Sequence, residues 1–166
     1  MDDSFQFVAL PSGLFEPWFN RRDAELAALG ARWAVVDANP GYPCRVSLVD
    51  AEVGEAVLSI PFTHHDVLSP YRASGPIYVR PGARTARPAV NEIPAMLRRR
   101  LLSVRAYDAA AMMIGAEVVR GAELEPVIRQ MMRNEAVQYL HVHNAGPGCY
   151  NCSVVRGGAG ATGATP

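Results

Sequence analysis

The stretch LLSVRAYDAAAMMIGAEVV, residues 101–119, decides how this chain folds. Its two ends, 101–107 and 112–119, are rich in branched and aromatic residues, and the short segment Asp108-Ala109-Ala110 lies between them. Two such runs separated by a few turn residues predict a β-hairpin, whose strands are antiparallel. We therefore expect a mainly antiparallel sheet.

On the C-terminal side of the hairpin, a helix is expected over 122–134. Apolar residues recur there at helical spacing, acidic residues fall in the first turn and basic residues near the end. The apolar stripe consists of Leu124, Val127, Ile128, Met131 and Met132. The segment VQYLHVHN, residues 137–144, then reads as a strand, and CSVVR, residues 152–156, as another.

On the N-terminal side, several short strands are expected between clusters of Pro, Gly and Asp. They cover residues 5–10, 32–37, 44–49, 56–62 and 76–80. Apolar residues between Phe15 and Leu29 share one helical face, with Pro17 in the first turn and Gly30 past the end. A further helical turn begins near Pro94. Strands in the middle and helices towards both ends predict a single α+β domain with two to three helices.

The domain is expected to span residues 1–156. Residues 157–166, GGAGATGATP, form a Gly/Ala-rich tail that we expect to be disordered. Gly158, Gly160 and Gly163 match the spacing G-x-G-x-x-G. That pattern binds a dinucleotide only between a strand and a helix, so no NAD is expected.

The charge pattern narrows the possible functions. The 166 residues carry 16 basic and 16 acidic side chains, so the formal net charge is zero. A neutral chain lacks the electrostatic footprint of a nucleic-acid or membrane-surface protein, and we expect neither partner. All the basic residues are Arg, which excludes a pyridoxal phosphate Schiff base and an ATP-binding P-loop because both need a Lys. No signal peptide or membrane span is evident, so a cytoplasmic protein is expected.

The segment HVHNAGPGCYNC, residues 141–152, is the first candidate site. On a strand, His141 and His143 point to the same side, and the turn that follows returns Cys149 towards them. With Cys152, these residues could form a tetrahedral zinc site. Four ligands from twelve residues leave little freedom, so an open site of His141, His143 and Cys149 is easier to build. The alternative is a packed strand and turn with no metal.

The segment THHDVLSPYRASGP, residues 63–76, is the second candidate. His64 and Asp66, with a distant histidine, match the order of ligands in a two-His-one-carboxylate iron site. We expect His65 and Asp66 to take part in catalysis. Arg45, Arg72 and Ser74 are expected to bind an anionic small molecule, because guanidinium groups pair with carboxylates or phosphates through two parallel bonds.

Three segments together resemble a bacterial family, the domain of unknown function numbered 1203. They are PGYPCRVSL, SPYRASGPIYVR and HVHNAGPGCYNC, in that order along the chain. The resemblance covers about residues 5 to 156 and implies a single-domain bacterial protein. It supplies no catalytic residue, and it implies that Cys152 is dispensable, which favours His143 with Cys149.

Three hypotheses follow for the function. The first is a small metal-dependent enzyme that binds Zn or Fe(II) and acts on an anionic small molecule. The second is a non-enzymatic protein with a structural zinc. The third is a metal-free thiol enzyme with Cys149 as the nucleophile and His143 or His141 as the base. Under the first we also expect the 64–75 loop to bring His64 or His65 close to His141 and His143. The state of oligomerisation is left open.

Overall fold

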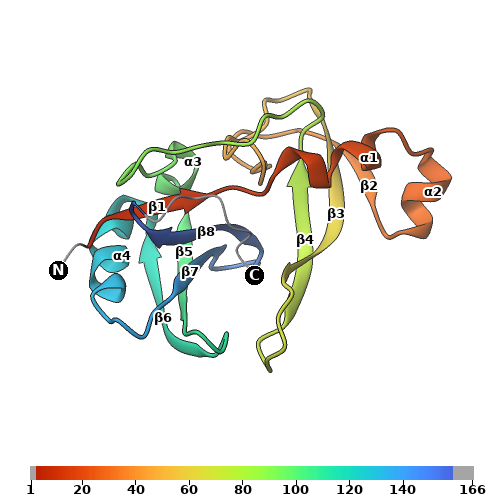
Figure 1. Cartoon of the computed structure of the whole chain (residues 1–166). Helices are drawn as coiled ribbons and strands as arrows, with labels where there is room; N and C mark the ends of the chain where they lie inside the picture. Colours follow the sequence, from red (N-terminus) through yellow and green to blue (C-terminus); the bar gives the residue numbers. More distant parts are fainter. Residues whose placement is uncertain (1–2, 159–166) are drawn as a thin grey trace.

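The computed structural model describes residues 3–158, which form two antiparallel sheets (Figure 1). The five-stranded sheet has the strand order β1-β8-β7-β5-β6 and the three-stranded sheet the order β2-β3-β4. The strands of the first sheet are β1 (Phe5–Val8), β8 (Tyr150–Arg156), β7 (Tyr139–Asn144), β5 (Leu101–Tyr107) and β6 (Met113–Arg120). Those of the second are β2 (Arg32–Val35), β3 (Ala56–His65) and β4 (Ala73–Val79). The predicted 101–119 hairpin is confirmed, and so is the α+β class.

One face of the five-stranded sheet is covered by helices. Alternate residues of β5, β7 and β8 point to this face, and the buried ones are apolar: Leu102, Val104, Ala106, Leu140, Val142, Cys152 and Val154. The helix α4 (Leu124–Met132) and the short helix α3 (Ala95–Arg98) pack on them, with α4 preceded by the 3-10 turn η2 (Gly121–Glu123). The expected amphipathic helix over 122–134 is therefore confirmed. Its apolar stripe packs into the larger hydrophobic core of the molecule.

The three-stranded sheet has its own core. Leu58 and Ile60 of β3 pack with Ile77 and Val79 of β4 and with Leu26 of helix α2 (Asp23–Ala28). The helix α1 (Glu16–Phe19), which follows the 3-10 turn η1 (Ser12–Leu14), lies close by. In Figure 1, α1 lies beside one end of β2 and α2 lies further out.

The second sheet meets the first across the face that the helices do not cover. At the hairpin tips, the Ser69 hydroxyl donates to the Ala111 carbonyl at 2.9 Å, which joins the β3–β4 and β5–β6 connections. Figure 1 shows both tips pointing downwards. Earlier in the chain, the buried Arg45 side chain donates from Nε to the Tyr150 carbonyl at 2.7 Å and so ties the 41–50 segment to β8. A hydrogen bond between His65 and Tyr139 holds the end of β3 against β7.

Two of the expected elements are wrong. The helix expected over 15–29 is broken into α1 and α2, because Glu25 accepts a hydrogen bond from the Arg22 N–H at 2.8 Å and starts a second helix there. The strand expected over 44–49 is a compact turn in which the Leu48 N–H donates to the Cys44 carbonyl and Leu48 adopts a positive φ of 52°. Cys44, Val46 and Leu48 are all buried, so the alternating pattern reflects a buried turn rather than a strand.

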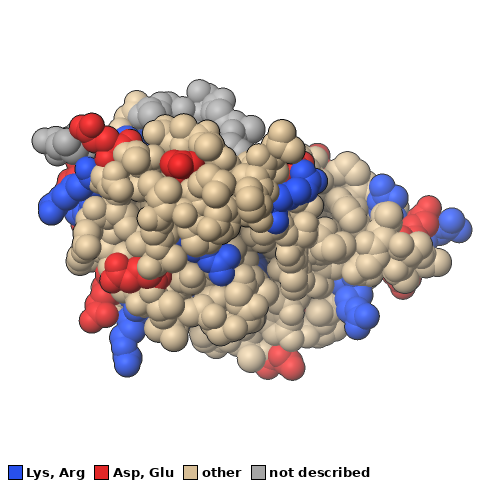
Figure 2. Space-filling model, turned by 90° about the horizontal axis from the view of Figure 1, so that it is seen from below, with Lys and Arg blue, Asp and Glu red and all other residues tan. Residues whose placement is uncertain are grey.

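On the face of the molecule seen in Figure 2, acidic and basic side chains are interspersed, with wide uncharged areas between them. Among the described residues, no helix is both long and apolar enough to cross a membrane. The N–H of Gly157 donates to the Ser4 carbonyl, so the domain continues to Gly158. The rest of the predicted tail, 159–166, lies outside the described residues.

Candidate functional site

Strand β7 places two histidines on the face opposite the helices. His141 is opposite Arg105 of β5 and Ser153 of β8, and His143 is opposite Ser103 and Tyr150. Leu140 and Val142, which alternate with the histidines, point into the helix-covered core. Both His side chains are fully buried, and their ring centroids are 6.1 Å apart. The prediction that they share one face is confirmed.

Strand β3 places His64 and His65 against the same face. The pairing of β3 with β4 shifts between Thr63 and His65, which is the register of a β-bulge. In a regular strand, consecutive side chains point to opposite faces, but a bulge redirects one of them. As a result, both His64 and His65 contact β7. The bulge therefore completes a group of four histidines, which we call the histidine cluster.

The cluster is compact. The ring centroid of His64 lies 5.1 Å from that of His143 and 6.3 Å from that of His141. The His65 centroid lies 4.9 Å from that of His141. The Tyr150 ring stacks on His64 at 5.1 Å with an interplanar angle of 10°, and its hydroxyl is hydrogen-bonded to the Ser153 hydroxyl at 2.8 Å. The expectation that the 64–75 segment approaches the strand with His141 and His143 is confirmed.

His65 differs from the other three because both of its ring nitrogens are already in use. Its Nδ1 lies 2.8 Å from the Tyr71 carbonyl, and its Nε2 lies 2.7 Å from the Tyr139 hydroxyl. A carbonyl can only accept, so Nδ1 carries the proton and Nε2 accepts from the tyrosine. With no free nitrogen, His65 is suited to hold the two sheets together. Its predicted catalytic role has no geometric support.

The other three histidines have buried ring nitrogens without a hydrogen-bond partner among the described residues. These are Nδ1 of His64, both nitrogens of His141 and Nε2 of His143. The Nδ1 of His143 lies 2.9 Å from the Gly148 carbonyl, so it carries the proton and leaves the lone pair on Nε2. Metal-binding histidines have this arrangement, in which a carbonyl orients the ring from the far nitrogen. We call His64, His141 and His143 the three-histidine group.

Burial keeps these three imidazoles neutral. Desolvation, with a smaller effect of neighbouring positive groups, lowers the pKa of His64 from 6.5 to about 4 and that of His141 to about 2. Desolvation also lowers the pKa of His143 to about 3, against the hydrogen bond to Gly148, which acts in the opposite direction. Neutral imidazole is the form that binds a metal or accepts a proton.

Arg105 faces the same group, although no sequence pattern predicts this contact. It lies opposite His141 on the neighbouring strand and is half-buried. Its positive charge is one of the causes that lower the pKa of each residue in the three-histidine group. Only the pairing of β5 with β7 reveals this neighbour, because 36 residues separate the two positions along the chain.

The predicted Cys149–Cys152 pair is divided by the sheet. Cys152 is opposite Val142 and is fully buried in the core beneath the helices, on the other face from the histidines. Burial raises the pKa of its thiol well above the usual range. The structure therefore does not bring Cys152 to the histidine cluster. Cys149 is half-buried at the end of the turn, and Cys44 is buried in the smaller core.

The contacts of Arg45 are those of a residue with a structural role. Its side chain is 2% exposed, and its Nη1 and Nε donate to the carbonyls of Pro43 and Tyr150 at 2.6 and 2.7 Å. Desolvation lowers its pKa to about 10, and the charge of a nearby Cys149 thiolate acts in the opposite direction. Arg45 thus lies near Cys149. Its hydrogen bonds to the two backbone carbonyls hold the chain in place, and they do not point towards an open site.

The remaining predicted residues lie on the exposed part of the β3–β4 hairpin. Asp66 and Arg72 form an ion pair with each other, and both side chains are more than half exposed. The Ser74 hydroxyl is within 2.9 Å of that of Thr63. None of these contacts involves the histidine cluster, so Asp66, Arg72 and Ser74 are not brought into the candidate site.

The three-histidine group fits a metal by its chemistry. Three imidazoles bound to one tetrahedral zinc, with Zn–N distances of about 2.0–2.1 Å, have ring centroids roughly 5 Å apart. The observed separations of 5.1, 6.1 and 6.3 Å are close to this value. In the described residues, no three His, Cys, Asp or Glu side chains converge as they stand to hold a metal ion. Binding therefore requires the rings to turn, and the second side-chain torsion of His is soft.

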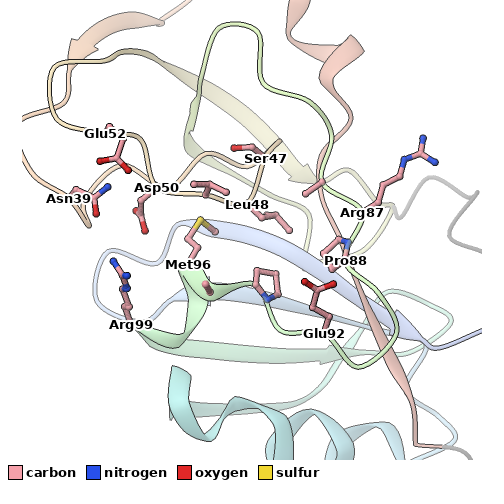
Figure 3. Close-up of a pocket in the computed structure, with 14 residues that line it drawn as sticks. Asn39, Ser47, Leu48, Asp50, Glu52, Arg87, Pro88, Glu92, Met96 and Arg99 are labelled. Carbon is pink, nitrogen blue, oxygen red and sulfur yellow. The ribbon is translucent and has the colours of Figure 1, made fainter.

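Hollows of the molecule lie outside the cluster, and two of them differ from it in their lining. A hollow of about 420 Å³ lies between the 39–52 and 86–99 segments (Figure 3). It is lined by acids such as Asp50, which is paired with Arg100, and Glu92, which accepts from the Ala89 N–H. An open hollow of about 590 Å³ between the two hairpin tips reaches Tyr139, the partner of His65. Neither hollow has a His or Cys in its lining, so the candidate chemistry remains at the three-histidine group.

Comparison with known proteins gives a family and no activity. A family model described as "Protein of unknown function (DUF1203)" matches residues 41–156, which include the whole histidine cluster. The chain belongs to this family, as the resemblance had indicated. No curated protein and no solved structure match the chain.

Proposed function

We propose that this member of the DUF1203 family is a small metal-dependent enzyme whose metal ligands are His64, His141 and His143. The observation that carries the proposal is the set of buried ring nitrogens on these residues that have no hydrogen-bond partner among residues 3–158. A buried polar group without a partner costs about 1–3 kcal/mol, so four such atoms in one cluster need an explanation. Binding of Zn(II) or Fe(II) gives each of the three rings a partner.

Three protein ligands are typical of a catalytic site, whereas structural zinc sites have four and are rich in cysteine. The fourth position of such an ion supplies Lewis-acid chemistry, which lowers the pKa of water towards about 7 or polarises a substrate oxygen. Cys152 lies on the other face of the sheet, so it does not complete a closed site with the histidines.

The protein's own residues have separate roles in this proposal. His143 is oriented by the Gly148 carbonyl, and His64 by the stacked Tyr150 ring. His65 holds β3 against β7 through Tyr139. The aromatic rings around the group exclude water and keep the imidazoles uncharged at neutral pH. We expect the enzyme to act on a small molecule in the cytoplasm, where Cys44, Cys149 and Cys152 stay reduced.

The metal-free thiol enzyme is the second candidate, since Cys149 is half-buried, near Arg45 and at the end of the turn that follows β7. A neighbouring cation favours a thiolate. In that case Cys149 reacts quickly with iodoacetamide and metal is absent.

Metal content and Co(II) spectroscopy test the proposal. We expect protein purified without a His tag, or reconstituted with Zn(II), to hold one ion per chain. We expect the Co(II) form to change its visible spectrum when azide enters an open position. The His143→Ala variant should lose the ion, and Cys152→Ala, on the opposite face, should keep it. Normal circular dichroism of both variants is the control for folding.

If the wild-type protein takes up neither Zn(II) nor Fe(II), the metal proposal is wrong and the thiol enzyme becomes the leading candidate. If it takes up one Zn(II) but azide leaves the Co(II) spectrum unchanged, the site is closed and the zinc is structural.

A further inference from the structure

The position of Arg105 suggests what the three-histidine group acts on. On the face opposite the helices, a row of side chains runs across the sheet from His141 on β7 to Arg105 on β5 and then to Ala116 on β6. Strand β6 is the last strand of this sheet. Arg105 therefore lies between the histidines and the sheet edge. A molecule that approaches across β6 reaches Arg105 before it reaches the histidines.

Arg105 is a half-buried cation without an acidic partner in the described part of the chain. Its Nε donates to the Ser103 hydroxyl at 3.3 Å, its guanidinium also hydrogen-bonds to the Tyr107 hydroxyl, and none of the ion pairs of residues 3–158 includes it. Its neighbours on this face, Ser103, Tyr107 and Ala116, are uncharged. Partly desolvated cations are usually paired, so this guanidinium is suited to receive an anion.

Other half-buried arginines of the molecule make the contrast clear. Arg80 is paired with Glu55, and Arg129 with both Glu125 and Asp3. Arg100, which is more deeply buried, is paired with Asp50. The fold thus supplies a carboxylate to each of these three arginines and backbone carbonyls to Arg45 and Arg156, whereas the partners of Arg105 in the described residues are side-chain hydroxyls.

The surface beside Arg105 is apolar. Ala116 and Val118 point to the same side of β6 as Arg105 does on β5, since they are opposite Arg105 and Ser103. Both are exposed, and Val118 has 61% of its surface in contact with solvent. An acid with a short hydrocarbon part can therefore place its anionic end at the guanidinium and cover these two side chains.

We propose that Arg105 binds the carboxylate of a small, partly apolar organic acid and holds it over Ala116 and Val118, next to the three-histidine group. Arginine forms two parallel hydrogen bonds to a carboxylate, so it fixes orientation as well as charge. This assignment rests on the proposed function for the reaction at the histidines. The binding of a carboxylate by Arg105 can be measured in the metal-free protein.

Binding of acetate, butyrate, hexanoate and inorganic phosphate to the metal-free protein tests the assignment. We expect the affinity to rise from acetate to hexanoate, because the longer chains cover more of Ala116 and Val118. Arg105→Gln should weaken hexanoate binding by about tenfold or more. The matched control is Arg72→Gln, an exposed arginine paired with Asp66, which should bind hexanoate as the wild type does.

A second variant keeps the test valid if Arg105→Gln alters the fold. Val118→Asp adds a carboxylate to an exposed position beside Arg105, so it should block hexanoate binding while circular dichroism stays normal. Equal binding of hexanoate by all four proteins overturns the assignment, and so does tighter binding of phosphate than of any carboxylate. The protein can also bind hexanoate in an Arg105-dependent way and take up no metal. That result supports the assignment of Arg105 and rejects the metal enzyme, so failure of the assignment and failure of the proposed function are distinguishable.

Discussion

The two faces of the five-stranded sheet are equally buried along strand β7 and have opposite chemistry. Leu140 and Val142 point to the helix-covered face, and His141 and His143 to the other face; all four have no exposed surface. On the first face, burial stabilises the fold because the side chains are apolar. On the second face, imidazole nitrogens are removed from water without a hydrogen-bond partner in the part of the chain that the structure describes. The same backbone thus carries a structural surface and, under our proposal, a functional one.

The largest effect on stability is expected from the helix-covered face. Leu140→Ala removes a fully buried side chain from the main core, so we expect a loss of about 2–5 kcal/mol in the free energy of unfolding. Urea denaturation measures this loss. Metal content per folded chain should be unchanged, because Leu140 points away from the histidines. Loss of metal together with stability would show that the two faces are not independent.

A substitution of its neighbour should have the opposite result. His141→Leu replaces an imidazole whose two nitrogens are buried and unpartnered with an apolar side chain of similar size. Since an unpaired buried polar group costs about 1–3 kcal/mol, the metal-free variant should be as stable as the wild type or about 1 kcal/mol more stable. It should take up no metal. A loss of more than about 2 kcal/mol in the metal-free protein would contradict the assignment of free ring nitrogens.

The pH dependence of stability also distinguishes the two faces, with a smaller expected effect. The unfolded chain protonates its histidines near pH 6.5, whereas burial holds the pKa of His141 near 2 and that of His143 near 3 in the folded protein. Below pH 6.5 the unfolded state binds more protons, so stability is fully present above that pH and is lost as the pH falls. Each residue contributes up to about 1.4 kcal/mol per pH unit.

This trend is measured by urea denaturation of metal-free protein between pH 5 and 7, where most carboxylates stay charged. Arg105 from β5, Arg45 and the histidines of β3 face these rings and favour the neutral form. The His141→Leu variant should show a shallower slope than the wild type. An identical slope would mean that His141 is protonated in the folded protein as readily as in the unfolded chain.

The sequence predicted much of the helix-covered face. Helical spacing of Leu124, Val127 and Ile128 and the hairpin at 101–119 are local patterns, and both were confirmed. The turn at 44–49 misled because the apolar residues Cys44, Val46 and Leu48 alternate in the sequence as they do in a strand, although the folded turn also buries Arg45 between them. Local patterns do not distinguish these two structures.

The site was predictable in part. The spacing of His141 and His143 placed them on one face, and the segment with His64 was expected nearby. The β-bulge that turns His64 and His65 to the same side is not visible in the sequence. The pairing of β5 with β7, which brings Arg105 beside His141, is not visible in the sequence either. Asp66 and Arg72 form an ion pair with each other instead of joining the site. Long-range register decided both outcomes.

Imidazole ¹⁵N NMR of the metal-free protein, before and after one equivalent of Zn(II), tests the central claim most directly. Before zinc, the account predicts neutral rings at pH 7 and a His143 that carries its proton on Nδ1. After zinc, the nitrogen signals of His64, His141 and His143 should shift, while those of His65, whose nitrogens are bound to Tyr71 and Tyr139, should stay in place. Unchanged signals from the three-histidine group, or a shift confined to His65, would contradict the account.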